Sequence, residues 1–161
     1  MSDKKELTKQ EAESKKCLET IFGTWGAVMS GKEKPDAYDK LSDFICDDIV
    51  TSNSLLDKMG IKDHSWNGKK EYMENIKAKF VPGAKGTVQA LDLKFMVEVN
   101  YCGPIITIKN EASGIKRGSK EYKPEGGITW HQVWVFKGGK LWKHIDIEDE
   151  KHEAGYKELW A

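Results

Sequence analysis

The sequence has few cysteines and no closely spaced pair of them. Cys17, Cys46 and Cys102 are its three cysteines, and they stand far apart with no histidine cluster beside them. A disulfide framework or a structural zinc site needs paired or closely spaced ligands. We therefore expect three buried, reduced thiols and no metal site.

The sequence also lacks an excess of charge of either sign. It holds 26 Lys and Arg against 26 Asp and Glu, so its formal net charge is zero. Proteins that bind nucleic acid or anionic membranes usually carry a basic excess. Residues 1–16 mix lysine and glutamate without the apolar stretch of a signal peptide or membrane span. We therefore expect a cytoplasmic protein with neither nucleic acid nor membrane as a partner.

Several motifs that indicate cofactor binding are absent. The sequence shows no glycine-rich phosphate loop, no nucleophile elbow and no metal-ligand spacing, so we expect no cofactor. It also shows no repeat and no linker, and its 161 residues suit one folded unit. We predict a single domain over 1–161, with a polar N-terminal arm at 1–16 and a C-terminal tail at 150–161.

Helical signals fill the first half of the chain. Thr8 and Glu11 have the spacing of a capping box, and apolar residues then recur at helical intervals up to Met29. Pro35 opens a second helix, and a third ends before Pro82. Residues 52–67 are predicted to form an irregular loop. Residues 150–161 are predicted to form a short C-terminal helix that carries Tyr156, Leu159 and Trp160.

Strand signals fill the second half. Apolar and polar residues alternate over 91–101, which predicts a long strand. Further extended segments are predicted at 105–115, 128–137 and 141–148, and a short one lies earlier in the chain at 49–51. Helices followed by strands are typical of an α+β protein, in which helices pack on one face of an antiparallel sheet.

The last hairpin suggests a site. Gly138 and Gly139 form a two-residue turn, and the register that continues from it places His131 opposite Asp146. Opposed side chains in an antiparallel pair share a face, so an imidazole could bond a carboxylate there. The pair has two readings, a pocket wall or an exposed ion pair worth ~0 to 1 kcal/mol.

The other face of the same hairpin is more apolar. In the register from the glycine turn it carries tryptophan and isoleucine side chains, among them Trp130, Trp134, Ile145 and Ile147. By pattern alone this face is the core, because monomers rarely expose so large an apolar patch.

Four segments together resemble a known family. They are residues 41–49 (LSDFICDDI), 66–72 (WNGKKEY), 133–141 (VWVFKGGKL) and 144–146 (HID). Their order and spacing resemble the SnoaL-like branch of the nuclear-transport-factor-2-like superfamily over most of the chain. The resemblance implies a cone-shaped roll, with a strongly curved antiparallel or mixed sheet and about three N-terminal helices over its concave face. It also implies a homodimer, in which the face of Trp130, Trp134, Ile145 and Ile147 meets a second subunit.

The resemblance implies catalytic residues as well. In polyketide cyclases and related isomerases of this family, a carboxylate at the position of Asp146 is the general base, and a histidine close to His131 assists. Limonene-epoxide-hydrolase-like members hold a water between that carboxylate and an asparagine, for which Asn53 is the candidate. They also use an arginine and an aspartate on a middle strand, where this chain has Lys109 and Glu111.

We therefore predict a cofactor-independent enzyme of the isomerase, cyclase, dehydratase or epoxide-hydrolase type that uses Asp146 as general base. Its ligand is expected to be a small apolar or ring-containing organic molecule, contacted by Trp25, Thr51, Trp142 and His144. The alternative is a module of the same fold that binds a ligand or a protein without catalysis, because one fold hosts many activities.

Overall fold

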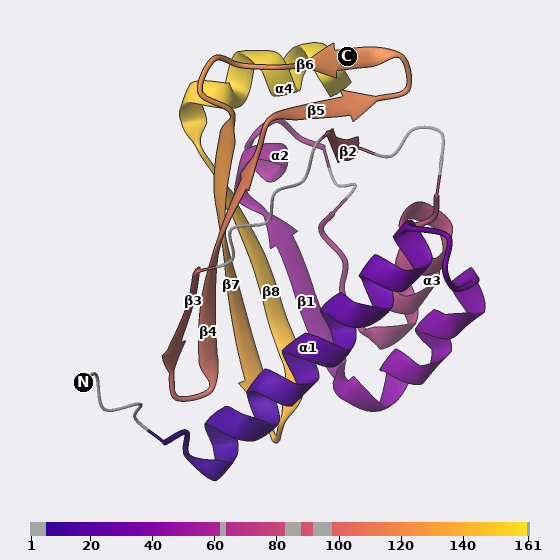
Figure 1. Cartoon of the computed structure of the whole chain (residues 1–161), viewed down its shortest axis with the longest axis vertical. Coiled ribbons are helices and arrows are strands. Elements are labelled where there is room, and N and C mark those ends of the chain that lie inside the picture. The colour runs from indigo at the N-terminus through magenta and orange to yellow at the C-terminus, as the bar shows by residue number, and fades with distance from the viewer. Residues whose placement is uncertain (1–5, 62–63, 83–87, 92–97, 161) are drawn as a thin grey trace.

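Helices come first along the chain, and strands dominate its second half (Figure 1). The structure, a computed structural model, describes residues 6–61, 64–82, 88–91 and 98–160. The helices are α1 (Lys9–Met29), the 3-10 helix η1 (Pro35–Phe44), α2 (Ser54–Lys58), α3 (Lys69–Lys79), the 3-10 helix η2 (Glu150–His152) and α4 (Glu153–Trp160). The strands are β1 (Ile45–Asn53), β2 (Val88–Leu91), β3 (Glu98–Cys102), β4 (Ile105–Ala112), β5 (Gly114–Arg117), β6 (Lys120–Tyr122), β7 (Ile128–Lys137) and β8 (Lys140–Glu148).

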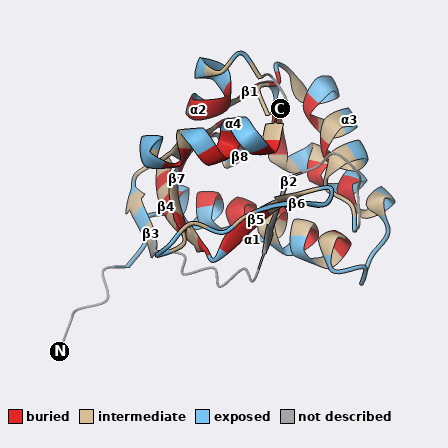
Figure 2. Cartoon of the chain, turned by 90° about the horizontal axis from the view of Figure 1, so that it is seen from above, coloured by how far each residue is buried: buried red, intermediate tan, exposed pale blue. Residues whose placement is uncertain are grey.

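The main sheet has five strands in the order β1-β8-β7-β4-β3. β1 runs parallel to β8, and the other neighbours are antiparallel, so the sheet is mixed. Helices α1, η1 and α3 cover its concave face, and buried residues gather between the two layers (Figure 2). This confirms the predicted α+β class and the N-terminal helices packed on one face of a curved sheet.

A smaller assembly lies across one end of the main sheet. Strands β2, β5 and β6 form a second sheet, and α4 packs beside it (Figure 1). A separate apolar cluster joins α2, α4, β5 and β7 there, consisting of Leu55, Leu56, Ile115, Ile128, Tyr156 and Leu159. The C-terminal residues therefore form part of the wall around the interior.

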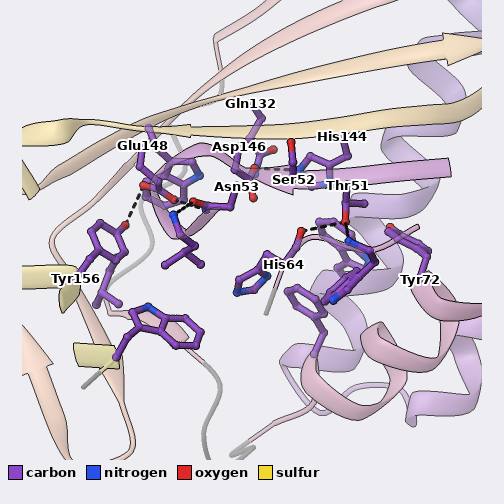
Figure 3. A pocket seen from close by; sticks show the side chains of 17 residues that line it. Thr51, Ser52, Asn53, His64, Tyr72, Gln132, His144, Asp146, Glu148 and Tyr156 are labelled. Carbon is purple, nitrogen blue, oxygen red and sulfur yellow. Dashed lines mark hydrogen bonds and ion pairs between the residues drawn. The ribbon is translucent and has the colours of Figure 1, made fainter. Parts of the chain in front are cut away.

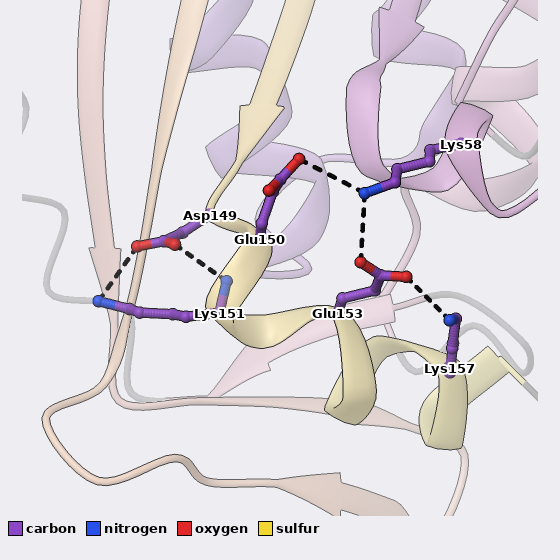
Figure 4. Close-up of polar contacts among 6 residues, drawn as sticks. All are labelled: Lys58, Asp149, Glu150, Lys151, Glu153 and Lys157. Carbon is purple, nitrogen blue, oxygen red and sulfur yellow. Dashed lines mark hydrogen bonds and ion pairs between the residues drawn. The ribbon is translucent and has the colours of Figure 1, made fainter.

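Ion pairs fasten this C-terminal segment to α2 (Figure 4). Lys58 Nζ lies 3.4 Å from both Glu150 Oε1 and Glu153 Oε2, and Lys157 Nζ lies 2.8 Å from Glu153 Oε1. Exposed pairs of this kind contribute little to stability because water and salt screen them. The apolar cluster therefore supplies most of the docking energy, and the ion pairs add orientation.

The N-terminal capping box is present as predicted. Thr8 Oγ1 accepts from the Glu11 amide at 3.2 Å, and Glu11 Oε2 accepts from the Thr8 amide at 3.1 Å. Residues 9–16 consequently belong to α1, which begins where the capping box predicts. Lysine and glutamate favour helices. None of the described helices, the 21-residue α1 included, is long and apolar enough to cross a membrane.

Two other local predictions need correction. The stretch predicted as an irregular loop contains α2, which Asn53 caps by accepting from the Leu56 amide at 3.0 Å. Cys102 is exposed, whereas Cys17 and Cys46 are buried free thiols as expected. Most of the predicted strand over 91–101 lies outside the described residues, and its two ends belong to different sheets.

The register of the last hairpin differs from the prediction beyond its first pairs. Phe136 still faces Leu141, but Val135 pairs with Lys143, so Trp142 is an extra residue in β8. One extra residue shifts every later pair and reverses the faces of that strand. His131 therefore lies opposite Ile147, and the prediction that it shares a face with Asp146 is wrong.

The same bulge divides the predicted Trp-rich face. Trp130 and Trp134 point toward the interior, where Trp134 is fully buried, whereas Ile145 and Ile147 lie on the outer face of the sheet. These four residues therefore do not form one surface. The homodimer stays a prediction, without the interface proposed for it.

We predict that Gly127, at the entry to β7, tolerates alanine less well than its neighbour Gly126. Both have positive φ, at 77° and 79°, which costs an L-residue ~1 to 2 kcal/mol. Only at Gly127 would the new Cβ meet backbone, 2.7 Å from the Ala112 carbonyl oxygen. In urea denaturation, Gly127→Ala should lose ~1 to 3 kcal/mol more than the matched Gly126→Ala. Equal losses would contradict this account.

Candidate active site

A cavity of about 170 Å³ lies between the concave face of the sheet, the helices and the C-terminal segment (Figure 3). An engineered apolar cavity of ~150 Å³ binds benzene, so this one suits a molecule with a single ring. Its apolar lining is largely aromatic, contributed by Trp25, Trp66, Phe80, Trp130, Trp160, Leu56 and Ile115. Its polar lining comes mainly from β1 and β8.

Three titratable side chains of β8 line the cavity together. His144, Asp146 and Glu148 stand two residues apart, and alternation along a strand gives them one face. His144 Nε2 donates to Asp146 Oδ1 at 3.0 Å, with 10% and 19% of the two side chains exposed. The bulge at Trp142 is what turns this face inward.

Glu148 is held from two sides. Its Oε1 accepts from Asn53 Nδ2 at 3.1 Å, and its Oε2 accepts from Tyr156 Oη at 2.9 Å. The pKa of Glu148 is raised to about 7, chiefly by burial and next by the negative charge of Asp146. The two hydrogen bonds oppose that rise because they stabilise the ionised form.

Residues of β1 complete the polar wall. Asn53 pairs with Asp146 across the parallel strands. Its Oδ1 is occupied by the first turn of α2, which leaves Nδ2 to donate to Glu148. Thr51 donates to the carbonyl of His64 and accepts from the amide of Trp66, both at 3.0 Å. Thr51 therefore ties the segment that carries these two rings to the sheet.

The structure brings five of the predicted site residues to the cavity. Two of them are polar residues of β1, two belong to β8 and one comes from α1, and all five line the same space: Thr51, Asn53, His144, Asp146 and Trp25. The ring of Trp25 stacks on Phe80 at 5.4 Å.

The other four predicted residues lie elsewhere. His131 is exposed and pairs with Lys109 across β7 and β4, on the outer face of the sheet. Lys109 Nζ and Glu111 Oε1 form an ion pair there at 2.6 Å. Trp142 is the bulge residue, and the ammonium groups of Lys137 and Lys143 lie over its ring. The predicted grouping of His131, Lys109, Glu111 and Trp142 with Asp146 is therefore wrong.

Sequence reasoning missed a role for Glu148 and for Tyr156. Glu148 had a usable signal, since two carboxylates two apart on a strand share a face. Tyr156 had none, because it reaches the site through the docking of α4. Among the described residues, no group of three or more His, Cys, Asp or Glu side chains is arranged to hold a metal ion.

No protein-family model matches the sequence, and no curated protein matches it. The fold is nevertheless that of NTF2-like proteins, an α+β cone with an open mixed sheet. An NTF2-like protein from Burkholderia xenovorans LB400 aligns with a TM-score of 0.62 and 13% identity, over 89% of this chain and 95% of that chain.

Two further structural neighbours are named for an activity or for a bound molecule. An LEH-like epoxide hydrolase from M. tuberculosis aligns with a TM-score of 0.59 and 13% identity, over 92% of this chain and 90% of that chain. TerC, co-crystallised with polyporic acid, aligns with a TM-score of 0.56 and 15% identity, over 89% and 97%. At such identities the likeness shows the fold, and it confirms the resemblance at that level. The fold neighbours include enzymes and NTF2-like proteins of unknown function.

We predict that Glu148 makes folding stability depend on pH. The pKa of Glu148 is about 7 in the folded protein and near 4.5 in the unfolded chain. Between pH 4.5 and pH 7 the folded state therefore keeps a proton that the unfolded state releases. The free energy of unfolding should therefore fall by up to ~3 kcal/mol as pH rises through this window.

The measurement is urea denaturation near pH 4.5 and near pH 8. Glu148→Gln should lack this fall, whereas Glu111→Gln, which removes a carboxylate on the outer face, should keep it. The same pH dependence in wild type and Glu148→Gln would contradict a buried Glu148.

Proposed function

We propose that this chain is a cofactor-independent enzyme that moves protons on a small ring-containing molecule, with Asp146 as general base. The observation that carries the proposal is the pairing of His144 with Asp146 beside a second carboxylate, Glu148, in a cavity with aromatic walls. Acid and base groups that converge in a cleft, with one pKa raised as that of Glu148 is, are typical of catalytic sites.

Asp146 is the better candidate for the base. His144 engages its Oδ1, which orients the carboxylate and leaves Oδ2 to receive a proton from a substrate. Glu148, in contrast, has both oxygens bonded to protein groups. A carboxylate held in one orientation within a largely apolar cavity is suited to remove a proton from carbon next to a carbonyl.

Glu148 is suited to be the second proton carrier. Its pKa of about 7 lies where both protonation states are populated near neutral pH, which favours general acid and base catalysis. Residues two apart on a strand are separated by ~6.6 Å, about the width of a six-membered ring with its substituents. Asp146 can thus take a proton at one position while Glu148 protonates another, which gives isomerisation or, with a leaving hydroxyl group, dehydration.

The epoxide-hydrolase type is the less favoured form of this proposal. Its pattern needs a charged pair beside the catalytic carboxylate, and the corresponding Lys109 and Glu111 lie on the outer face. Asn53 does lie across from Asp146, but its amide donates to Glu148. Proton transfer needs none of these missing groups.

A second candidate is a ligand-binding module without catalysis. It is favoured by the internal satisfaction of the polar groups, because Asn53 and Tyr156 bond both oxygens of Glu148 and His144 bonds Asp146. A polar network bonded within the protein in this way can hold a fold rigid without performing chemistry.

We predict that Asp146→Asn keeps the cavity but removes the base. In a screen of cyclic enolisable ketones and cyclic hydroxyketones, kcat should fall by ~100-fold or more while KM changes little. Glu111→Gln, the matched control, should keep wild-type rates. Undiminished turnover in Asp146→Asn would remove the proposed base, and tight binding without turnover in wild type would favour the module.

We also predict a pH dependence that Glu148 controls. If Glu148 donates the proton, its acid form is required, so kcat should fall as pH rises above about 7. Glu148→Gln should be slower and lack that decline. A decline of equal midpoint in the variant would assign the titration to another group.

A further inference from the structure

Two side-chain amides are found among the described residues that line the cavity, and they differ in what they bond. Asn53 is engaged at both ends, since its Oδ1 accepts from the Leu56 amide and its Nδ2 donates to Glu148. Gln132 is engaged at one end, where its Oε1 accepts from Trp134 Nε1 at 3.1 Å. Its Nε2 has no hydrogen-bond partner among the described residues, and the protein does not cover that atom completely. The nitrogen of Gln132 is therefore a donor open to a ligand.

The contact with Trp134 fixes which way the amide of Gln132 points. An indole N–H donates and never accepts, so the amide atom beside it must be the oxygen, and the nitrogen points away from the indole. The ring of Trp134 is fully buried and lies against the ring of His144, with 4.6 Å between the centroids. Close packing leaves such a ring no other position. The donor of Gln132 is therefore held in place before any ligand binds.

Gln132 also stands beside the proposed base. It pairs with Asp146 across β7 and β8, and directly opposed residues of antiparallel strands share a face with Cβ atoms ~5 Å apart. Both side chains line the cavity, and Figure 3 shows them next to each other on its sheet side. One ligand can therefore meet an N–H donor and a carboxylate oxygen at neighbouring points. A ketone offers a matching pair of groups, its carbonyl oxygen and the C–H next to it.

We propose that Gln132 Nε2 donates a hydrogen bond to the carbonyl oxygen of a ring ketone while Asp146 removes a proton from the adjacent carbon. This inference deepens the proposed function and rests on it. The C–H bond breaks, its proton passes to Asp146, and its electron pair forms a C=C bond as the carbonyl π electrons move to the oxygen. The N–H of Gln132 then faces an enolate oxygen, which it stabilises more than the neutral carbonyl. Gln132 is thus a catalytic residue that supplies no charge.

Two variants separate this role from a purely structural one. Gln132→Met nearly keeps the volume but loses both the donor and the bond to Trp134, whereas Gln132→Glu keeps an oxygen for Trp134 and loses the donor. We expect kcat for cyclic ketones to fall ~100-fold or more in both, with a smaller change in KM. Gln10→Met, the same exchange at an exposed residue of α1, should keep wild-type rates. Wild-type kcat in Gln132→Glu would overturn the donor role.

Binding tests the hydrogen bond without turnover. The probes are cyclohexanone and methylenecyclohexane, which have nearly the same shape and differ in the oxygen that accepts. The side-chain amide resonance of Gln132, assigned by its loss in Gln132→Met, should shift downfield in NMR spectra with cyclohexanone and not with methylenecyclohexane. The ratio of the two dissociation constants should move ~5-fold against the ketone in Gln132→Met, about one hydrogen bond. The ratio should stay unchanged in Gln10→Met.

The failures of the two proposals are distinguishable. Asp146→Asn leaves Gln132 in place, so its ratio of dissociation constants should match that of wild type. A ketone-specific shift of the Gln132 amide without turnover in wild type would overturn only the proposed enzyme activity. An unchanged ratio in Gln132→Met would overturn the inference, as would the absence of that shift, whether or not cyclohexanone binds.

Discussion

The bulge at Trp142 sets which side chains of the last strand face the interior. Because side chains alternate along a strand, one extra residue sends Ile145 and Ile147 outward and His144 and Asp146 inward, with Glu148 beyond them. Three titratable groups on a concave face cannot be packed into a dry core without a large free-energy cost. The polar side of the cavity follows from this single insertion.

The hydrogen bonds and the pKa of Glu148 depend on elements far apart in the sequence. Asn53 donates to Glu148 because α2 occupies its other amide atom, and Tyr156 donates because α4 is docked. Lys58 joins α2 to the C-terminal segment through Glu150 and Glu153. Burial raises the pKa of Glu148, these two donors oppose the rise, and the balance near neutrality follows from how α2 and α4 pack.

Much of the fold could be predicted from local pattern, because α1, α3, β7 and β8 have strong periodicity and clear end signals. Asp146 and Asn53 could be placed in one pocket by resemblance. The face of His131 could not, because Leu141, Ile145 and Ile147 alternate regularly and predict one continuous apolar face without a bulge. In the structure the extra residue Trp142 leaves Leu141 buried in the core and turns Ile145 and Ile147 to the outer face. Tyr156 depends on tertiary docking, which leaves no periodic signal.

The central claim is that Glu148 lies in the cavity as a carboxyl group poised between its two protonation states. The most direct measurement is a titration of the glutamate side-chain carboxyl resonances by carbon-13 NMR, assigned with Glu148→Gln. The account predicts one resonance with a midpoint near pH 7, and a higher midpoint in Tyr156→Phe, which loses a donor to the ionised form. Titration of every glutamate near the usual pKa of 4.5 would contradict it, because Glu148 would then lie in water.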